Sequence, residues 1–195
     1  MTRRTAVFGY GSLVATRSAA QTLGRPMPDP LPAELCGWRR RWSLNRDNLR
    51  SEKTFAIEPG GEIPASILGL NLERDGAGVD GPNGVLIELT ESELERLDLR
   101  EMRYDRVEVT REVLGGERFD RIFTYTAKTR HFCGEPPSGS VILSSYASVV
   151  EAGFRALGDG SLEAYRRTTG PHPVAVVDGV LIRGEEIPPG NPRAW

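Results

Sequence analysis

Near its amino terminus the chain reads Ala6-Val7-Phe8-Gly9-Tyr10-Gly11-Ser12-Leu13. The apolar run predicts a short buried strand that ends at Phe8 or Tyr10. The two glycines predict a sharp turn with φ > 0, because a residue without a Cβ also lets the backbone approach its neighbours closely. The N–H groups of such a turn form a small concave site for an oxyanion or a carboxylate, and Ser12 adds a hydroxyl. The stretch therefore predicts either a ligand-binding turn at a strand end or a tight turn without a ligand.

The composition is that of a soluble globular protein. Of the 195 residues, 38% are hydrophobic and 27% are charged, and the formal net charge is −2. A chain of this length can bury a sufficient hydrophobic core without disulfides or bound metal ions, and we expect residues 1–195 to form one domain. The near-balanced charge gives no reason to expect binding of nucleic acid or of an anionic membrane surface. The 22 glycines and 14 prolines favour a strand-rich fold with many turns.

The sequence carries no motif for a metal or a cofactor. Cys36 and Cys133 are far apart, only two histidines are present, and neither residue type follows a metal-ligand spacing. No window approaches the roughly 18 apolar residues of a membrane helix. The first residues, Met1-Thr2-Arg3-Arg4, lack the apolar stretch of a secretory signal. We therefore expect a cytoplasmic protein that uses no metal and no cofactor.

Alternation of apolar and polar residues predicts several strands. Trp38, Trp42 and Leu44 share one face of a strand, and arginines at positions 39 and 41 lie on the other. Those arginines are either solvated or include one that attracts a substrate carboxylate. Further strands are expected at 54–58, 65–72, 84–89, 104–113 and 121–128, with residues 73–83 as a long hairpin connection.

The best-defined predicted helix begins at a capping box. In Thr90-Glu-Ser-Glu93 the threonine hydroxyl and the second glutamate satisfy each other's backbone donors, which predicts a helix over 91–100. Leu94 and Leu97 lie on one face, and Glu101, seven residues after Leu94, continues that face. Glu101 is therefore predicted to point inward, unlike the other acidic residues of this helix, which should be solvated. Helical spacing of apolar residues also indicates a helix over 141–157.

Together these elements predict an α+β fold. We expect a small mixed or antiparallel β-barrel with helices packed around it. Residues 173–195 are expected to form a C-terminal hairpin and tail, because Asp178-Gly179 lies between two apolar runs. This hairpin either caps a pocket or pairs edge to edge in a homodimer.

Two segments resemble one protein family. Phe8-Gly9-Tyr10-Gly11-Ser12-Leu13 resembles the Tyr-Gly-Ser turn of the γ-glutamylcyclotransferase superfamily. Leu97-Asp98-Leu99-Arg100-Glu101-Met102-Arg103-Tyr104 resembles the Leu-Asp-x-x-Glu-x-x-x-Tyr stretch that carries the catalytic glutamate of that family, with one residue fewer between Glu101 and Tyr104. The resemblance covers roughly residues 5 to 130, with the helix at 141–157 as a looser match. The segment from Pro173 onward has no counterpart in it.

The resemblance implies a reaction and a site. The family catalyses attack of a γ-glutamyl α-amine on its own γ-carbonyl, which yields 5-oxoproline and a free amine, with no metal or cofactor. Glu101 would be the catalytic acid and base, since apolar surroundings raise the pKa of a carboxyl group. The turn made by Tyr10, Gly11, Ser12 and Leu13 would bind a small γ-glutamyl substrate, and Tyr125 would add a pocket hydroxyl.

Other functions stay open on the sequence alone. One is a small-molecule-binding member of the same fold that performs no turnover. A phosphate- or nucleotide-binding protein is disfavoured, because no lysine follows the glycines and no G-x-x-x-x-G-K-[S/T] motif occurs. Ser12 as a nucleophile is disfavoured too, because neither His131 nor His172 lies in a recognisable triad context.

Overall fold

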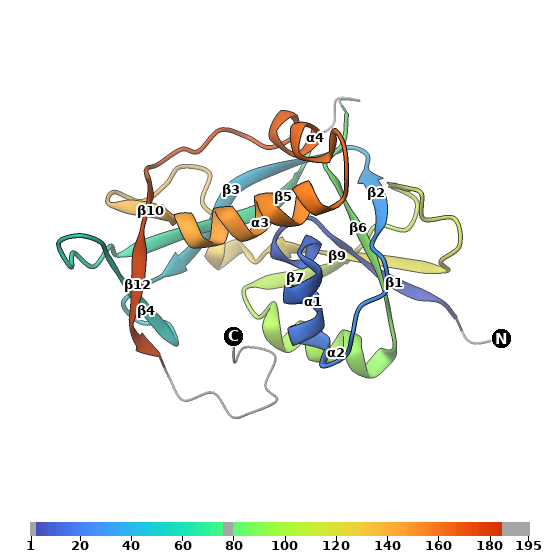
Figure 1. Cartoon of the computed structure of the whole chain (residues 1–195), viewed down its shortest axis with the longest axis horizontal. Coiled ribbons are helices and arrows are strands. Elements are labelled where there is room, and N and C mark those ends of the chain that lie inside the picture. Colours follow the sequence, from blue (N-terminus) through green and yellow to red (C-terminus); the bar gives the residue numbers. More distant parts are fainter. Residues whose placement is uncertain (1–2, 76–79, 185–195) are drawn as a thin grey trace.

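The computed structural model describes residues 3–75 and 80–184. Its largest sheet has six strands, of which only β1 and β9 pair in parallel. β1 lies near the middle of this sheet and is buried, as its apolar sequence predicts (Figure 1). The strands follow the order β7 (Tyr104–Glu108), β9 (Arg121–Ala127), β1 (Thr5–Gly9), β6 (Asn83–Leu89), β2 (Leu31–Leu35) and β8 (Val113–Leu114).

Two smaller sheets complete the β-structure. The four-stranded sheet has the order β11 (Val176–Val177), β10 (Ser140–Leu143), β5 (Ser66–Arg74) and β3 (Trp38–Asp47). The two-stranded sheet pairs β12 (Gly179–Gly184) with β4 (Lys53–Ile57) and extends from one end of the molecule (Figure 1). We call this two-stranded sheet the β4–β12 ribbon.

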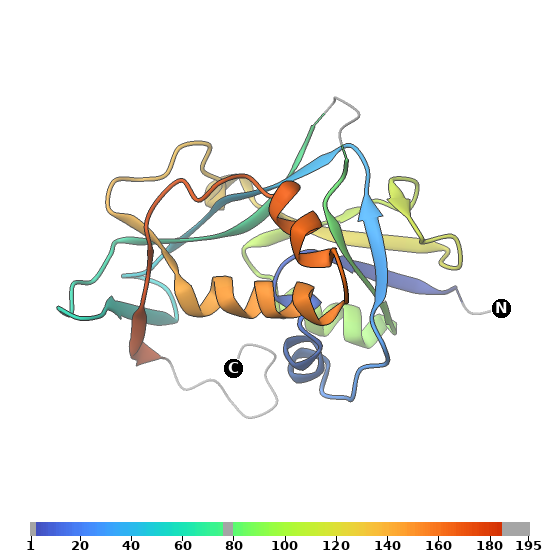
Figure 2. The same cartoon turned by 45° about the horizontal axis from the view of Figure 1, so that its top comes forward.

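The helices pack outside the sheets. The described part of the chain holds α1 (Thr16–Leu23), α2 (Glu91–Arg100), α3 (Ser144–Ala156) and α4 (Ser161–Arg167), with short 3₁₀ helices η1 (Ser12–Val14) and η2 (Thr129–His131). Figure 2 shows α3 and α4 on one side of the sheets and α1 beside α2 on another. The α+β class with mixed sheets is confirmed, and the sheets curl as a half-barrel around the core.

Helix α3 approaches the chain after β1 unusually closely. A Cβ built on Gly153 would lie 2.8 Å from the backbone nitrogen of Ala15 and 3.0 Å from the carbonyl carbon of Val14. Val150 and Phe154 on the same face are fully buried. The absence of a side chain at position 153 therefore allows α3 to rest directly on η1, close to the predicted ligand-binding turn.

Three predicted elements differ from the structure in the middle of the chain. The predicted strand over 104–113 is divided, since β7 ends at Glu108 and β8 begins at Val113. The segment 73–83 is not a hairpin connection, because β5 pairs with β3 and β10 whereas β6 pairs with β1 and β2. The predicted helix over 141–157 begins only at Ser144, since Ile142 and its neighbours form β10. Ile142 fits the helical spacing of the following residues, so periodicity alone placed it on the wrong element.

The C-terminal hairpin prediction is wrong. β11 pairs in parallel with β10, and β12 pairs antiparallel with β4, so the two apolar runs join different sheets. Asp178 lies between β11 and β12, where the chain passes from one sheet to the other. Its carboxylate accepts a hydrogen bond from the Ser144 hydroxyl, and its carbonyl accepts one from the Glu58 N–H at 2.9 Å. These tertiary contacts override the local tendency of Asp-Gly to form a hairpin turn. The remainder of the predicted tail, residues 185–195, lies outside the described residues.

The arginines of β3 have structural partners. Arg39 pairs with Asp75, whereas Arg40 is fully buried beside the stacked rings of Phe154 and Tyr165, with its guanidinium carbon 4.8 Å from each ring centroid. Burial lowers the pKa of Arg40 to about 10. No arginine at positions 39 to 41 lines the cavities described below, so their substrate-binding interpretation finds no support.

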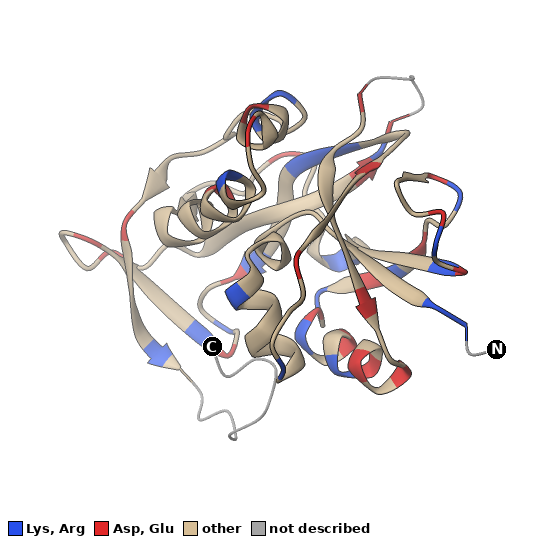
Figure 3. Ribbon diagram, turned by 45° about the vertical axis from the view of Figure 1, so that its right-hand side comes forward, with Lys and Arg blue, Asp and Glu red and all other residues tan. Residues whose placement is uncertain are grey.

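Basic and acidic residues are both distributed along the sheets and helices of the ribbon (Figure 3). This distribution agrees with the near-zero net charge of the sequence. Among residues 3–75 and 80–184, no helix combines the length and the apolar character needed to cross a membrane.

Candidate active site

The turn after β1 owes its shape to close packing. The chain passes from Gly9 directly into η1, in which the Val14 N–H donates to the Gly11 carbonyl at 3.0 Å. Neither glycine has a positive φ, so that prediction is wrong. Their small size serves close approach instead: a Cβ on Gly9 would lie 3.0 Å from the Leu13 Cβ, and one on Gly11 would lie 3.1 Å from the Tyr146 hydroxyl.

Glu101 lies at the end of α2 with its side chain turned inward. The helix starts at the predicted capping box, in which both reciprocal hydrogen bonds form, and ends at Arg100. The Glu101 N–H donates to the Leu97 carbonyl at 2.9 Å, and its side chain is 16% exposed. The inward orientation predicted from the spacing of Leu94, Leu97 and Glu101 is confirmed, because both leucines are buried on the same side.

Burial and charge act on Glu101 in opposite directions. Burial raises the pKa of its carboxyl group, and the nearby guanidinium groups of Arg100 and Arg103 lower it, with a net rise. Its Oε1 lies 3.1 Å from Nε of Arg100. The carboxylate is therefore ion-paired, yet it binds a proton more readily than an exposed glutamate does, which suits a group that accepts and returns a proton.

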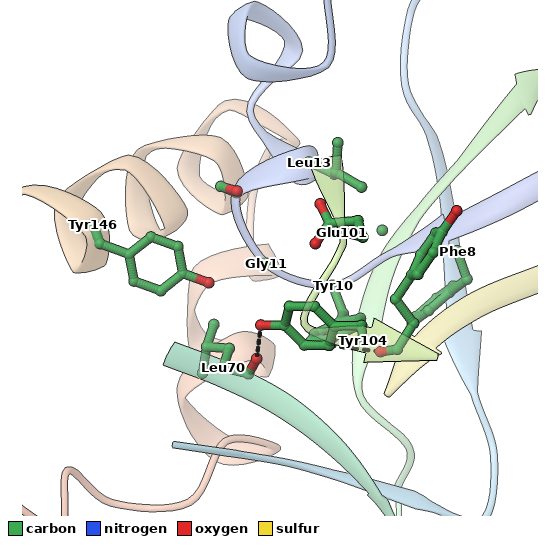
Figure 4. A pocket seen from close by; sticks show the side chains of 11 residues that line it. Phe8, Tyr10, Gly11, Leu13, Leu70, Glu101, Tyr104 and Tyr146 are labelled. Atoms are coloured by element: carbon green, nitrogen blue, oxygen red, sulfur yellow. Dashed lines mark hydrogen bonds between the residues drawn. The ribbon is translucent and has the colours of Figure 1, made fainter. Parts of the chain in front are cut away.

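A cavity of about 40 Å³ brings the predicted site residues together (Figure 4). Roughly three water-sized groups fit in such a volume. All six residues singled out in the sequence line it, namely Tyr10, Gly11, Ser12, Leu13, Glu101 and Tyr125, together with Phe8, Gly9, Leu70, Tyr104 and Tyr146. We call this cavity the Glu101 pocket.

Hydroxyl groups in the Glu101 pocket come partly from residues that the sequence did not indicate. Figure 4 shows the hydroxyls of Tyr104 and Tyr146 beside the Gly11 turn, towards which the Glu101 carboxylate also points. Tyr104 donates to the Leu70 carbonyl at 2.8 Å. Burial raises the pKa of both tyrosines, so both hydroxyls are protonated near neutral pH. Tyr146 comes from α3, far away in the sequence, and only its helical spacing with apolar residues was visible there.

Tyr125 lines the pocket, but its hydroxyl is engaged elsewhere. It donates to Oδ1 of Asp98 at 2.6 Å, and the other oxygen of that carboxylate lies 2.9 Å from Nη1 of Arg106. Asp98 was expected to be solvated and is instead half-buried between these partners. The Tyr125 carbonyl accepts a hydrogen bond from the Tyr10 hydroxyl at 2.8 Å. Tyr125 thus positions its neighbours, whereas Tyr104 and Tyr146 present hydroxyls beside the turn.

Arg100 connects Glu101 to the turn after β1. Its side chain is 4% exposed and donates to the Ser12 hydroxyl at 2.8 Å and to the Ser18 hydroxyl at 3.1 Å, in addition to its contact with Glu101. Ser12 is therefore an acceptor in a structural network. Neither His131 nor His172 lines the pocket, and His172 packs edge-on against Trp42. This arrangement gives Ser12 no histidine base.

A larger groove opens beside the Glu101 pocket. It has a volume of about 750 Å³ and lies between α1, α3, the β3–β5 pair and the β4–β12 ribbon. Ser12, Glu101, Tyr104 and Tyr146 line both spaces. Glu101 therefore lies at the boundary between the Glu101 pocket and the larger groove.

Solved structures share this fold, although no family model and no curated protein matches the chain. YkqA from Bacillus subtilis is 20% identical over 89% of the chain, with a TM-score of 0.58, and the chain spans 56% of that protein. A γ-glutamyl cyclotransferase is 17% identical, with 85% of this chain and 86% of that one covered and a TM-score of 0.55. A glutathione-specific γ-glutamyl cyclotransferase from yeast is 15% identical over 88% of this chain and 99% of that one, with a TM-score of 0.50.

These likenesses establish the fold. The chain has the γ-glutamylcyclotransferase-like fold that its two sequence segments indicated, and this expectation is confirmed. Activity is a separate question, because proteins that share a fold at such low identity often differ in function.

Proposed function

We propose that the protein cyclises the γ-glutamyl group of a small γ-glutamyl amine, dipeptide or glutathione to 5-oxoproline and releases the amine. The observation that carries the proposal is Glu101: a buried, ion-paired carboxylate whose pKa is raised and which faces the turn after β1. The shared fold with γ-glutamyl cyclotransferases supports the same assignment.

The reaction needs a group that accepts and donates protons. The substrate α-ammonium gives a proton to the Glu101 carboxylate, and the free amine attacks the γ-carbonyl carbon, so that a new C–N bond closes the ring. Glu101 gives its proton to the leaving nitrogen as the bond between that nitrogen and the γ-carbon breaks. The ring nitrogen then gives up a second proton, which passes through Glu101 to the departing amine and leaves 5-oxoproline and an ammonium group. The nucleophile belongs to the substrate, so the protein chiefly holds the γ-glutamyl chain in a folded geometry for attack.

Donors near Glu101 would stabilise the charge that develops on the carbonyl oxygen. The first N–H groups of a helix have no partners within the helix, so the start of η1 offers the amides of Gly11, Ser12 and Leu13. The hydroxyls of Tyr104 and Tyr146 lie beside the same turn. Preorganised donors of this kind contribute strongly to catalysis, because they need no reorganisation as the charge forms.

Glu101→Gln tests the proposal. The variant keeps the size of the side chain and cannot accept the proton, so we expect release of 5-oxoproline from γ-glutamyl-glycine and glutathione to fall about 10²- to 10⁴-fold. Glu95→Gln is the matched control, because Glu95 is exposed on the same helix and should keep full activity. Full activity of Glu101→Gln would overturn the mechanism. Binding of these compounds by the wild type without product would instead indicate a non-catalytic binding protein of the same fold.

A further inference from the structure

An ion pair links the turn after Glu101 to the start of the β4–β12 ribbon. Arg103 donates from Nη1 to Oε1 of Glu52 at 3.1 Å and from Nη2 to Oε2 at 2.5 Å, so both carboxylate oxygens are engaged. The side chains of Arg103 and Glu52 are only 14% and 15% exposed. Two-pronged pairs of this kind have a fixed geometry, and solvent screens them little when they are mostly buried. The pair therefore holds the Arg103 guanidinium in one place.

The backbone on each side of this ion pair is held by other contacts. The Lys128 N–H donates to the Arg103 carbonyl at 3.0 Å, next to the start of β7. Glu52 directly precedes β4, and the fully buried Asn48 side chain accepts a hydrogen bond from the Phe55 N–H of that strand at 2.9 Å. Because both backbone segments are fixed independently, the carboxylate of Glu52 can direct the Arg103 side chain.

Arg103 also acts on Glu101. It follows Glu101 by two residues, in a turn where the Tyr104 N–H donates to the Glu101 carbonyl at 2.8 Å, and both side chains line the groove. Burial raises the pKa of the Glu101 carboxyl group, and the charges of Arg100 and then of Arg103 lower it. The Arg103 guanidinium is therefore close enough to two carboxylates to affect both, and it is bound to Glu52.

The other groups that face Glu101 carry no charge near neutral pH. In the described part of the chain they are tyrosines from four separate elements, and burial raises the pKa of each hydroxyl. They are Tyr10 after β1, Tyr104 on β7, Tyr125 on β9 and Tyr146 on α3. The ionisation of Glu101 is therefore governed by burial and by its two neighbouring arginines.

Glu52 keeps its charge throughout the range in which Glu101 titrates. Burial acts to raise the pKa of Glu52, but the hydrogen bonds and charge of Arg103, together with the charge of Arg46 on β3, lower it to about 2. Lys53 on β4 also interacts with Glu52, and His131 in η2 interacts with Arg103. Because the pKa of Glu101 is raised instead, the Glu52 carboxylate stays ionised while Glu101 gains or loses its proton.

We propose that Glu52 is a positioning residue for Glu101: it holds Arg103 at the groove wall and thereby keeps this cation from forming a second ion pair with the Glu101 carboxylate. This inference rests on the proposed function, in which Glu101 accepts a proton from the substrate ammonium. Each bound cation favours the ionised carboxylate, so a carboxylate paired with two guanidinium groups would be a weaker base. Arg100 already contacts Glu101, and Glu52 limits the ion pairs of Glu101 to this one.

Glu52→Gln tests this role through the pH dependence of activity. The variant keeps the size of the side chain but removes the charge that holds Arg103, so the guanidinium should turn towards Glu101. We expect the acidic limb of the kcat/KM profile for γ-glutamyl-glycine to move to lower pH. The value of kcat above the limb should fall, because a weaker base takes the proton less readily. A merely structural loss would lower activity without moving the limb.

Carbon-13 NMR of protein labelled at the glutamate carboxyl carbons measures the same change without turnover. The Glu101 signal is identified by its absence in Glu101→Gln, and its titration should move to lower pH in Glu52→Gln. Glu52→Asp keeps the charge but shortens the side chain, so it should cause a smaller shift in the same direction and replaces Glu52→Gln if that variant does not fold.

The matched control removes a similar ion pair elsewhere. Arg166 donates to the two oxygens of Glu151 at 3.2 Å and 2.9 Å, and Glu151 lines neither the Glu101 pocket nor the groove. Glu151→Gln should therefore leave the Glu101 titration and the kcat/KM profile unchanged.

A double variant shows whether Glu52 acts through Arg103. Arg103→Gln alone should move the Glu101 titration to higher pH, because it removes a nearby cation. Adding Glu52→Gln to Arg103→Gln should cause no further change, since the cation that Glu52 holds is then absent.

The outcomes distinguish the two proposals. An unchanged Glu101 titration in Glu52→Gln and Glu52→Asp overturns the inference and leaves the proposed function intact. A shift to lower pH that persists in the Arg103→Gln background also overturns the inference, since Glu52 would then act by its own charge. Absence of 5-oxoproline from γ-glutamyl-glycine and from glutathione overturns the proposed function, while the NMR titration separately decides whether Glu52 controls the ionisation of Glu101.

Discussion

Among residues 3–75 and 80–184 two arginines are buried, Arg40 and Arg100, and they have very different surroundings. Arg100 faces a carboxylate and two serine hydroxyls. Arg40 lies against two stacked aromatic rings and donates to the Thr169 hydroxyl at 3.0 Å and to the Asn83 carbonyl. Arg100 therefore adjusts the proton affinity of Glu101, whereas Arg40 joins β3, β6 and the end of α4 by packing. A buried charge indicates a functional site when its partner can exchange a proton with a ligand.

Removing Arg40 should have the largest effect on stability. Arg40→Ala would leave a cavity beside the stacked rings of Phe154 and Tyr165 and should lower the free energy of unfolding by about 3 kcal/mol. Arg40→Met refills much of that space without a charge and should lose clearly less. Denaturant unfolding of both variants measures the difference. Equal losses would show that the hydrogen bonds of Arg40, and not its packing, hold these elements together.

Removing Arg100 should act on the pH dependence of activity. A nearby cation favours the ionised carboxylate, so Arg100→Gln should raise the pKa of Glu101 further and move the acidic limb of the kcat/KM profile to higher pH. Arg103→Gln should shift the limb in the same direction by less, because Arg103 contributes after Arg100. An unchanged acidic limb in Arg100→Gln would show that this pair does not set the pKa of the base.

The smallest effect concerns the stability of the Glu101→Gln variant. Because the pKa of Glu101 is raised in the folded state, the folded protein binds more protons than the unfolded chain between the two pKa values. Wild-type stability therefore falls as pH rises through that window, and glutamine avoids this cost. The variant should gain melting temperature over the wild type as the pH rises from about 4.5, the unperturbed region of a glutamate. A gain that is independent of pH would contradict this account.

Features that depend on interactions between residues close in the sequence could be predicted, whereas features that depend on contacts between distant elements could not. The capping box at Thr90 and the stripe from Leu94 to Glu101 are local, and helix geometry alone turned Glu101 inward. The pocket hydroxyl of Tyr146 and the bond from Arg100 to Ser12 depend on how distant elements pack, and no local pattern showed them. The prediction at Asp178 was wrong for the opposite reason. Its local preference for a hairpin turn was overridden because the flanking strands β11 and β12 pair with β10 and β4.

The contact at Gly153 also affects where α3 places the Tyr146 hydroxyl. Tyr146 lies two turns earlier on the same helix, where its hydroxyl approaches Gly11, while Gly153 rests on Ala15. Because residue 153 has no side chain, the backbone of α3 lies in direct contact with the chain after β1. We expect a single methyl group there to push α3 away from Ala15, and with it the Tyr146 hydroxyl away from Gly11, so that a residue outside the pocket lining would change the width of the Glu101 pocket.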